Sequence, residues 1–229
     1  MPFYDILVLF KSQTQLKFIL CYNFFMGEKF FEYGKEETDF LKNSDEKMKE
    51  LIENTPHIFR AVHEDVFCSL VYSIAGQQIS NKALETIFNR LKTLAGEITP
   101  EKISALTAEK IASCGMSLRK AQNIFDLAKK ETKGEIRLED LKNLSDDEAI
   151  KQLTSLKGVG KWTAEMTLIF CFERKDILSF GDFGIKKGLK ILYGDDVVKK
   201  QNFLNMKQKF SPYATIASFY LWELANKRA

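Results

Sequence analysis

Apolar residues recur at helical spacing along most of this 229-residue chain. A Ser-x-x-Glu capping box at Ser145–Glu148 is followed by Ile150, Leu153 and Leu156, three positions apart on one helical face. Similar stripes predict helices over 65–75 and 80–91. Only four prolines and no alternating run of β-branched residues argue against a substantial sheet. We therefore predict an all-α fold, large enough for one domain or two small interlocked helical subdomains.

Polar residues mark where several of these helices begin. We expect Ser44 to cap a short helix that carries Met48, Leu51 and Ile52. Thr99-Pro100 has the proline at the first helical position, where its missing N–H costs nothing.

Two glycines, Gly158 and Gly160, interrupt the apolar pattern after Leu156. A glycine can adopt positive φ and lets another backbone come close, so these residues end one helix. A second helix is predicted from about Lys161. Bare amides at a helix N-terminus suit a phosphate oxygen, although a lone Gly-x-Gly is also typical of an ordinary tight turn.

A second motif follows at 179–189, where Asp182 enters another amphipathic helix. On spacing alone this aspartate is an N-cap. Together, however, Leu-x-Gly-Val-Gly-x-Trp-Thr-Ala-Glu-Met at 156–166 and Gly-Asp-Phe-Gly-Ile-Lys-Lys at 181–187 resemble the helix-hairpin-helix (HhH-GPD) DNA glycosylases, and within them the 3-methyladenine DNA glycosylase II branch. The resemblance spans roughly residues 60–226 and is far more specific than any one part of it.

The resemblance predicts the domain organisation. Residues 61–229 are expected to form the HhH-GPD domain, and 26–60 a preceding segment. The family often has an N-terminal β-rich lobe, which about sixty residues cannot hold, so we expect it to be absent or vestigial. Residues 1–25 are a doubtful extension that polar residues interrupt too often for a membrane span, and we hypothesise that translation begins at Met26.

Charge and cysteine content narrow the function classes. Residues 1–75 carry 8 lysines and arginines against 12 acidic residues, and 76–229 carry 26 against 19, so a basic face is expected on the later part. The four cysteines have no close pair, which excludes Cys-x-x-Cys zinc or redox spacing. The chain also lacks the C-terminal four-cysteine loop of the endonuclease-III-like members of the superfamily, so no iron–sulfur cluster is expected. We expect a reduced, cytoplasmic protein.

The resemblance implies base excision from DNA, with Asp182 at the position of the family's catalytic aspartate. Breaking an N-glycosidic bond passes through an oxocarbenium-like state that a carboxylate near C1′ stabilises. Relatives that also cut the strand use a lysine at the start of the second hairpin helix, where this chain has Trp162. Lys161 is adjacent but points about 100° away around the helix, so a monofunctional hydrolase is predicted.

The same resemblance implies an aromatic pocket for the flipped base, which suits the cationic ring of an alkylated purine. Trp222 matches the family position whose ring stacks against the flipped base, and Trp162 at the hairpin is the second tryptophan available to the pocket, although a core tryptophan is the alternative for either. Met166 stands where relatives have tyrosine, and Glu165 could approach the base or support the pocket.

DNA contacts are implied at two turns. In the Gly-Gln-Gln-Ile-Ser turn at 76–80, Gln78 matches the side chain that fills the gap left by the extruded nucleotide, with Gln77 and Ile79 beside it, unless these residues only end a helix. Arg119 and Lys120, in a further turn, could reach phosphates or simply be exposed.

The hairpin is the second contact, through residues Gly158, Val159, Gly160 and Lys161. In the family a monovalent cation, Na⁺ or K⁺, sits there on backbone carbonyls, which match Thr154, Leu156 and Val159. No other cofactor is expected. The implied partner is double-stranded DNA with damaged bases, bound by a monomer.

Three functions stay open. The first is a monofunctional glycosylase for alkylated purines. The second is a hairpin glycosylase for oxidised guanine, uracil or a mismatched base, which assays across lesions would separate. The third is a DNA-binding hairpin module without catalysis, for which Asp182→Asn would change nothing.

Overall fold

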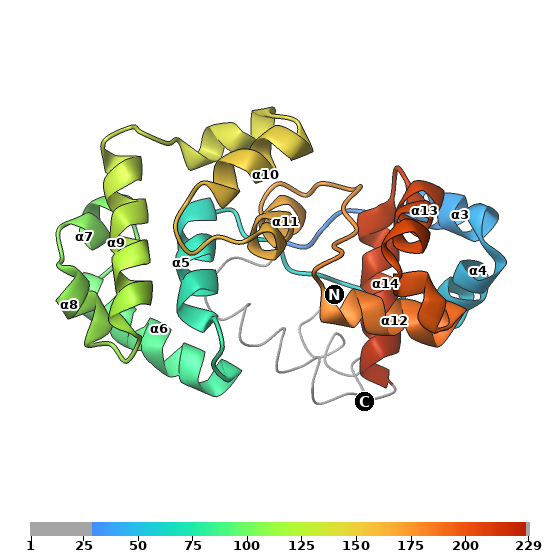
Figure 1. The fold of residues 1–229 in the computed structure, drawn as a ribbon, viewed down its shortest axis with the longest axis horizontal. Coiled ribbons are helices and arrows are strands. Elements are labelled where there is room, and N and C mark those ends of the chain that lie inside the picture. Colours follow the sequence, from blue (N-terminus) through green and yellow to red (C-terminus); the bar gives the residue numbers. More distant parts are fainter. Residues whose placement is uncertain (1–28, 228–229) are drawn as a thin grey trace. The chain divides into compact units, whose positions relative to one another are not determined.

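The computed structural model describes residues 29–227, and their regular structure is helical (Figure 1). The prediction of an all-α fold is confirmed. Between the described helices, the β structure is one isolated bridge between Phe30 and Ala61, so residues 29–62 contain no β lobe. The doubtful extension 1–25 and the proposed start at Met26 lie outside the described residues.

The described residues divide into two compact units, one formed by 29–62 together with 173–227 and the other by His63–Phe172. The first unit combines residues that precede the second unit in the sequence with residues that follow it. Its helices are α3 (Lys35–Ser44), α4 (Glu46–Glu53), α12 (Phe183–Tyr193), η2 (Asp195–Val198), α13 (Lys200–Phe210) and α14 (Ala214–Lys227). Those of the second unit are α5 (Val66–Gly76), α6 (Asn81–Ala95), α7 (Pro100–Ser104), α8 (Ala108–Ala112), α9 (Leu118–Thr132), η1 (Leu138–Asn143), α10 (Asp146–Thr154) and α11 (Lys161–Phe170).

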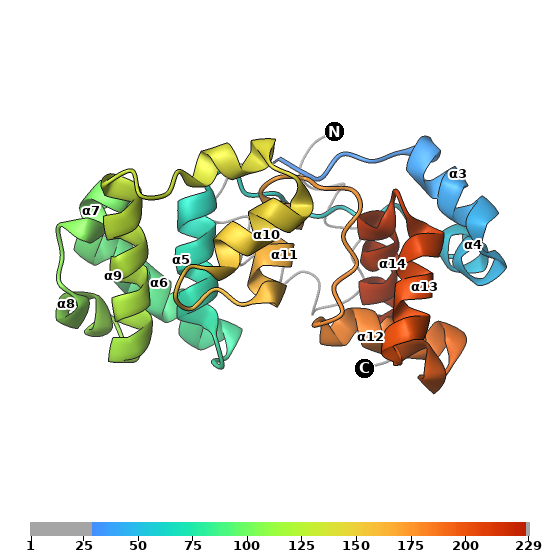
Figure 2. The same ribbon diagram turned by 45° about the horizontal axis from the view of Figure 1, so that its top comes forward.

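In the second unit α5 is the central element, and it packs against α6, α9 and α11 (Figure 2). Its side chains Leu70, Val71 and Ile74 are completely buried, as a helix hydrophobic on most of its faces requires. Removing each such side chain from water contributes roughly 1.5–3 kcal/mol. The helices that carry the predicted functional turns therefore rest on a well-packed core.

In the first unit α14 is the central element, and residues 214–221 are all buried. Its closest neighbour is α12. Gly188 of α12 lies directly against the backbone of Leu221, and a Cβ at this position would overlap the Leu221 carbonyl oxygen. The two helices can approach this closely only because the residue is glycine.

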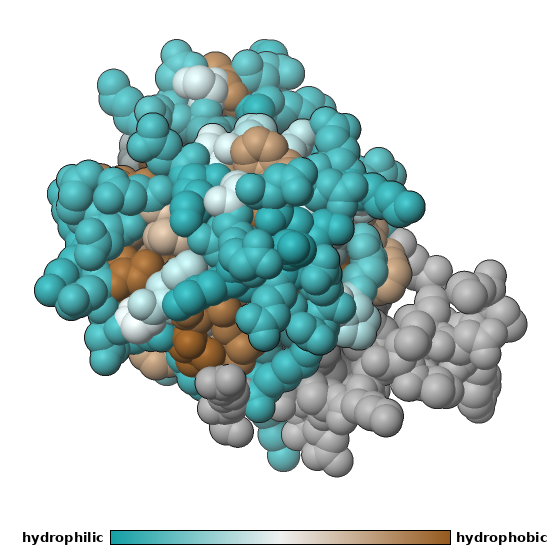
Figure 3. Space-filling model, turned by 90° about the vertical axis from the view of Figure 1, so that its right-hand side faces the viewer, coloured by the Kyte–Doolittle hydropathy of each residue, from teal (hydrophilic) through white to brown (hydrophobic). Residues whose placement is uncertain are grey.

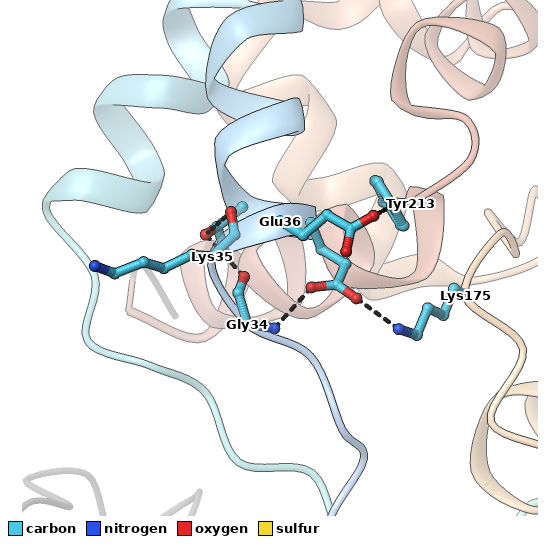
Figure 4. Close-up of polar contacts among 7 residues, drawn as sticks. Gly34, Lys35, Glu36, Lys175 and Tyr213 are labelled. Atoms are coloured by element: carbon cyan, nitrogen blue, oxygen red, sulfur yellow. Dashed lines mark hydrogen bonds and ion pairs between the residues drawn. The ribbon is translucent and has the colours of Figure 1, made fainter.

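Residues 29–62 are held to the later part of the first unit by ion pairs and hydrogen bonds. Glu37 accepts a hydrogen bond from the Gly34 amide (2.8 Å) and pairs with Lys175 (2.5 Å), while the Tyr213 hydroxyl donates to Glu36 (2.8 Å; Figure 4). Burial raises the pKa of Glu37, but the bonds from Lys175 and Gly34 outweigh it and leave the pKa below its ordinary value.

The start of α4 differs from the prediction. Ser44 is the last residue of α3, and Asp45 caps α4 by accepting a hydrogen bond from the Met48 amide at 2.8 Å. The expected apolar residues do lie on this helix. Asp45 also binds Lys209 (2.6 Å) and the Tyr193 hydroxyl (2.7 Å), contacts from distant residues that favour it over the neighbouring serine.

The face drawn in Figure 3 is mostly hydrophilic, with apolar side chains in small groups.

Candidate active site and nucleic-acid interface

Asp182 is the N-cap residue of α12, and only 7% of the residue is exposed to solvent. One carboxylate oxygen, Oδ1, accepts hydrogen bonds from the Ile185 amide (2.8 Å) and from the Trp222 indole Nε1 (2.8 Å). The N-cap interpretation is thus confirmed, and it does not compete with a catalytic role. Two donors and the positive end of the helix dipole hold the carboxylate in one position.

Trp222 reaches Asp182 from α14, the helix packed against α12. Its ring also stacks on Phe219, with the centroids 6.0 Å apart. Gly184 makes room for it, because a Cβ there would come within 2.7 Å of the Trp222 ring atom Cδ1. The sequence predicted Trp222 in the base pocket but did not indicate its hydrogen bond to Asp182. It did not indicate the role of Gly184 either, although Gly184 lies within the motif at 181–187.

The glycine hairpin lies in the second unit between α10 and α11. The capping box of Ser145 and Glu148 at the start of α10 is confirmed. Gly158 has φ +84° and requires glycine, whereas Gly160 has φ −87° and serves as the N-cap residue of α11. Gly160 is exposed and leaves the amides of the first turn of α11 without a side-chain cap, as a phosphate site requires.

Four predicted site residues lie on the first two turns of α11. Trp162 is 47% exposed, which excludes the core interpretation for this tryptophan within its own unit. Lys161 is exposed and forms an ion pair with the buried Glu165 (3.8 Å), while Met166 is half-buried. Glu165 is thus buried, and its approach to a flipped base stays a prediction.

The turn between α5 and α6 places its two glutamines differently. Gln78 is exposed and has φ +58°, a left-handed backbone that a non-glycine residue rarely adopts, and Ile79 beside it is exposed as well. Gln77 is half-buried, and its Nε2 donates to the carbonyl oxygen of Gly158 (2.7 Å). Gln77 therefore joins this turn to the hairpin, a contact that the sequence did not indicate.

Lys120 does not extend outward to reach phosphates. Its ammonium group donates to the backbone carbonyls of Ala75 (2.9 Å) and Gln77, at the C-terminal end of α5. Burial lowers the pKa of Lys120, and the positive charge of Arg119 adds to this effect. A lysine at the negative end of a helix dipole is stabilising, so its role here is that of a cap.

The cation expected at the hairpin stays a prediction. Of the carbonyl groups assigned to it, that of Leu156 accepts a hydrogen bond from the Val159 amide (3.1 Å). The Thr154 hydroxyl donates a hydrogen bond to the Ile150 carbonyl (2.7 Å). The group of Thr154 that could bind a cation is therefore its backbone carbonyl. Carbonyl oxygens of this kind suit Na⁺ or K⁺.

Other metal chemistry has no set of ligands in the part of the chain described. Residues 29–227 contain no group of three His, Cys, Asp or Glu side chains placed to hold a metal ion. Cys68, Cys114 and Cys171 are free thiols, and Cys21 lies outside the described residues.

The functional residues thus form two sets, Asp182 with Trp222 in one unit and the hairpin with the Gln77–Ile79 turn in the other. The sequence profile of the HhH-GPD superfamily base excision DNA repair proteins matches residues 71–211, which include every predicted site residue except Trp222. The chain belongs to this superfamily. The role of Asp182 as the catalytic aspartate stays a prediction.

Similar HhH-GPD proteins include DNA-3-methyladenine glycosylase 1 of Schizosaccharomyces pombe, which is 35% identical over 162 residues, or 69% of this chain and 71% of that protein. The DNA-3-methyladenine glycosylase of Saccharomyces cerevisiae is 32% identical over 204 residues, 71% of this chain and 68% of that protein.

Among solved structures, the DNA-3-methyladenine glycosidase of Bacillus halodurans superposes with a TM-score of 0.79 at 31% identity, covering 87% of this chain and 94% of that one. The 3-methyladenine DNA glycosylase of S. pombe, crystallised with abasic DNA, gives 0.68 at 31% identity, covering 82% and 96%. Both confirm the HhH-GPD fold. None of the helices within 29–227 has the length and apolar character needed to cross a membrane.

Proposed function

We propose that this chain is a monofunctional DNA glycosylase that removes alkylated purines, of the 3-methyladenine and 7-methylguanine type, from double-stranded DNA in base excision repair. The observation that carries the proposal is the Asp182 carboxylate, fixed by the Ile185 amide and the Trp222 indole at a helix N-terminus. Similarity to 3-methyladenine glycosylases at 31–35% identity supports it.

The substrate base must first leave the helix. Unstacking and unpairing cost a few kcal/mol, part of which a side chain inserted into the gap restores. Gln78 suits this role because it is exposed and its left-handed backbone projects it from the turn. The amides at the start of α11 bind the DNA backbone next to it, with a monovalent cation at the hairpin carbonyls adding positive charge.

Bond cleavage then depends on charge at C1′. As the N-glycosidic bond breaks, the sugar becomes oxocarbenium-like, and the Asp182 carboxylate stabilises that charge and orients the attacking water. An alkylated purine is cationic and departs as a neutral base, so the enzyme needs little acid catalysis. The exposed ring of Trp162 offers an electron-rich face to such a cation.

Strand cleavage is not part of the proposed reaction. It requires an amine nucleophile at the position that Trp162 occupies. Lys161 is turned away from that position, solvated, and paired with Glu165. The abasic product is therefore left intact.

A base-release assay tests the proposal. Duplexes each carrying one lesion, among them a 3-methyladenine analogue, hypoxanthine, 8-oxoguanine, uracil and a mismatch, are incubated with the protein, and products are resolved before and after hot alkali. We expect base release from the duplex that carries the 3-methyladenine analogue, with strand breaks only after alkali. Direct nicking trapped by borohydride would assign an amine nucleophile such as Lys161, and release of another lesion alone would change the substrate. Binding without any release would leave a non-catalytic hairpin module.

A further inference from the structure

The two turns predicted to touch DNA are joined by one side chain. Gln77, in the turn after α5, donates from Nε2 to the carbonyl of Gly158 in the hairpin, 81 positions away in the sequence, at 2.7 Å. The acceptor is a carbonyl oxygen, so the donor must be the amide nitrogen, and the orientation of the Gln77 amide is fixed.

Gly158 is held from a second direction. The side-chain amide of Asn123 packs against it, since a Cβ on residue 158 would come within 2.6 Å of Asn123 Nδ2, and φ is +84°. Gly158 thus contacts the side chains of both Gln77 and Asn123.

The other end of the connection is anchored by Lys120. Its ammonium group binds the Ala75 and Gln77 carbonyls, so the backbone that carries Gln77 is fixed to α9. The next residue, Gln78, has a strained left-handed conformation, which persists only where the surroundings determine it. The hydrogen bonds of Lys120 and Gln77 hold the backbone next to Gln78 in this conformation.

We propose that Gln77 is a positioning residue that couples the base-extrusion turn to the phosphate-binding hairpin, with Lys120 as its anchor. The proposal rests on the proposed function and adds a role to it. Binding of a phosphate by the hairpin then sets the position of Gln78, and the two turns act on DNA as one rigid body. Two independent loops would each lose conformational freedom on binding, a cost that the existing link removes. The prediction that Gln77 itself contacts DNA is separate from this role and stays a prediction.

A mutant cycle tests the coupling. Gln77→Met keeps the length of the side chain but removes the donor, and Gln78→Ala removes the extrusion side chain. Single-turnover excision is measured for the wild type, both single variants and the double variant. Gln122→Met, on the exposed face of α9, is the matched control and should excise at the wild-type rate.

We expect Gln77→Met to slow excision about 10-fold, which corresponds to ~1.4 kcal/mol in the barrier. We also expect Gln78→Ala to cost much less in the Gln77→Met background than in the wild type. An unchanged excision rate in Gln77→Met, or losses that simply multiply in the double variant, would overturn the proposal.

Two further measurements keep the test decisive. If Gln77→Met does not fold, Gln77→Glu replaces it: its ionised carboxylate repels the Gly158 carbonyl, whereas the protonated form can donate to it. The ratio of variant to wild-type rates should then rise as the pH is lowered toward about 5, and a flat ratio would contradict the coupling.

If the wild type releases no base, the proposed function fails, and the cycle is measured instead by 2-aminopurine fluorescence next to an abasic-site analogue. Non-additive changes in base unstacking would still support the coupling. Additive changes would overturn it as well.

Discussion

At the scale of single residues, Asp182 combines a structural and a chemical task. Its Oδ1 caps α12 and accepts the indole N–H of Trp222, so the same contacts that stabilise the helix fix the carboxylate. The cap was predictable from sequence because it joins residues three apart. The indole contact joins residues 40 apart, a separation that leaves no periodic pattern to detect.

Trp222→Phe tests whether the indole positions this carboxylate. Phenylalanine keeps a ring against Phe219 but removes the donor, and a hydrogen bond to a charged group contributes roughly 1.5–3 kcal/mol. We expect single-turnover base excision to fall about 10-fold or more, with DNA affinity close to wild type.

The matched control is Tyr193→Phe, also in the first unit, which removes the hydroxyl donor to the Asp45 carboxylate. It should lower the melting temperature without slowing excision. Wild-type excision by Trp222→Phe would show that the Asp182 position does not depend on the indole.

At the scale of elements, the contact between α12 and α14 sets the geometry of the site. Gly188 permits the close approach of the helices, and Gly184 leaves space for the Trp222 ring. The sequence predicted α12 but gave no reason for two glycines within it, since a glycine in a helix interior costs about 1 kcal/mol relative to alanine. Only the packing explains them.

Gly188→Ala should destabilise the first unit. The new methyl group would overlap the Leu221 carbonyl, and backbone on both sides cannot rotate away, so the helices must separate. Overpacking of this kind costs roughly 1–3 kcal/mol, more than the gain in helix propensity. Urea unfolding would measure the loss.

Lys190→Ala, an exposed change on the same helix, should stay within about 0.5 kcal/mol of the wild type. If Gly188→Ala were as stable as this control, the close helix contact would not exist in solution.

At the scale of the whole molecule, helix content and most helix starts could be predicted from the sequence, because capping and apolar spacing are local. The partition into units could not. Glu37 with Lys175, and Gln77 with Gly158, are contacts over 138 and 81 positions that depend on the finished fold. The start of α4 at Asp45 rather than Ser44 has the same cause.

Stability should fall in mildly acidic solution because of His63. Burial lowers its pKa from 6.5 to about 4, so the folded protein keeps this histidine neutral while the unfolded chain takes up a proton. The contribution of the neutral His63 to the free energy of unfolding is fully present above the unfolded pKa of 6.5. It is lost as the pH falls toward 4, at roughly 1.4 kcal/mol per unit of pH.

Urea unfolding between these pH values should show a shallower decline for His63→Phe than for the wild type. His57→Phe, at an exposed histidine whose pKa burial lowers less, is the comparison. Equal slopes for wild type and His63→Phe would mean that His63 is protonated in the folded state.

The central claim is that Asp182 performs the chemistry of base excision, and Asp182→Asn tests it most directly. Asparagine retains an oxygen that can accept from the Ile185 amide and the Trp222 indole, so the fold and the DNA affinity should be kept. It lacks the negative charge that stabilises the oxocarbenium-like state. We predict that single-turnover release from alkylated duplex falls about 100-fold or more, with wild-type affinity for an abasic-site analogue. Release within a few-fold of the wild-type rate would contradict the account.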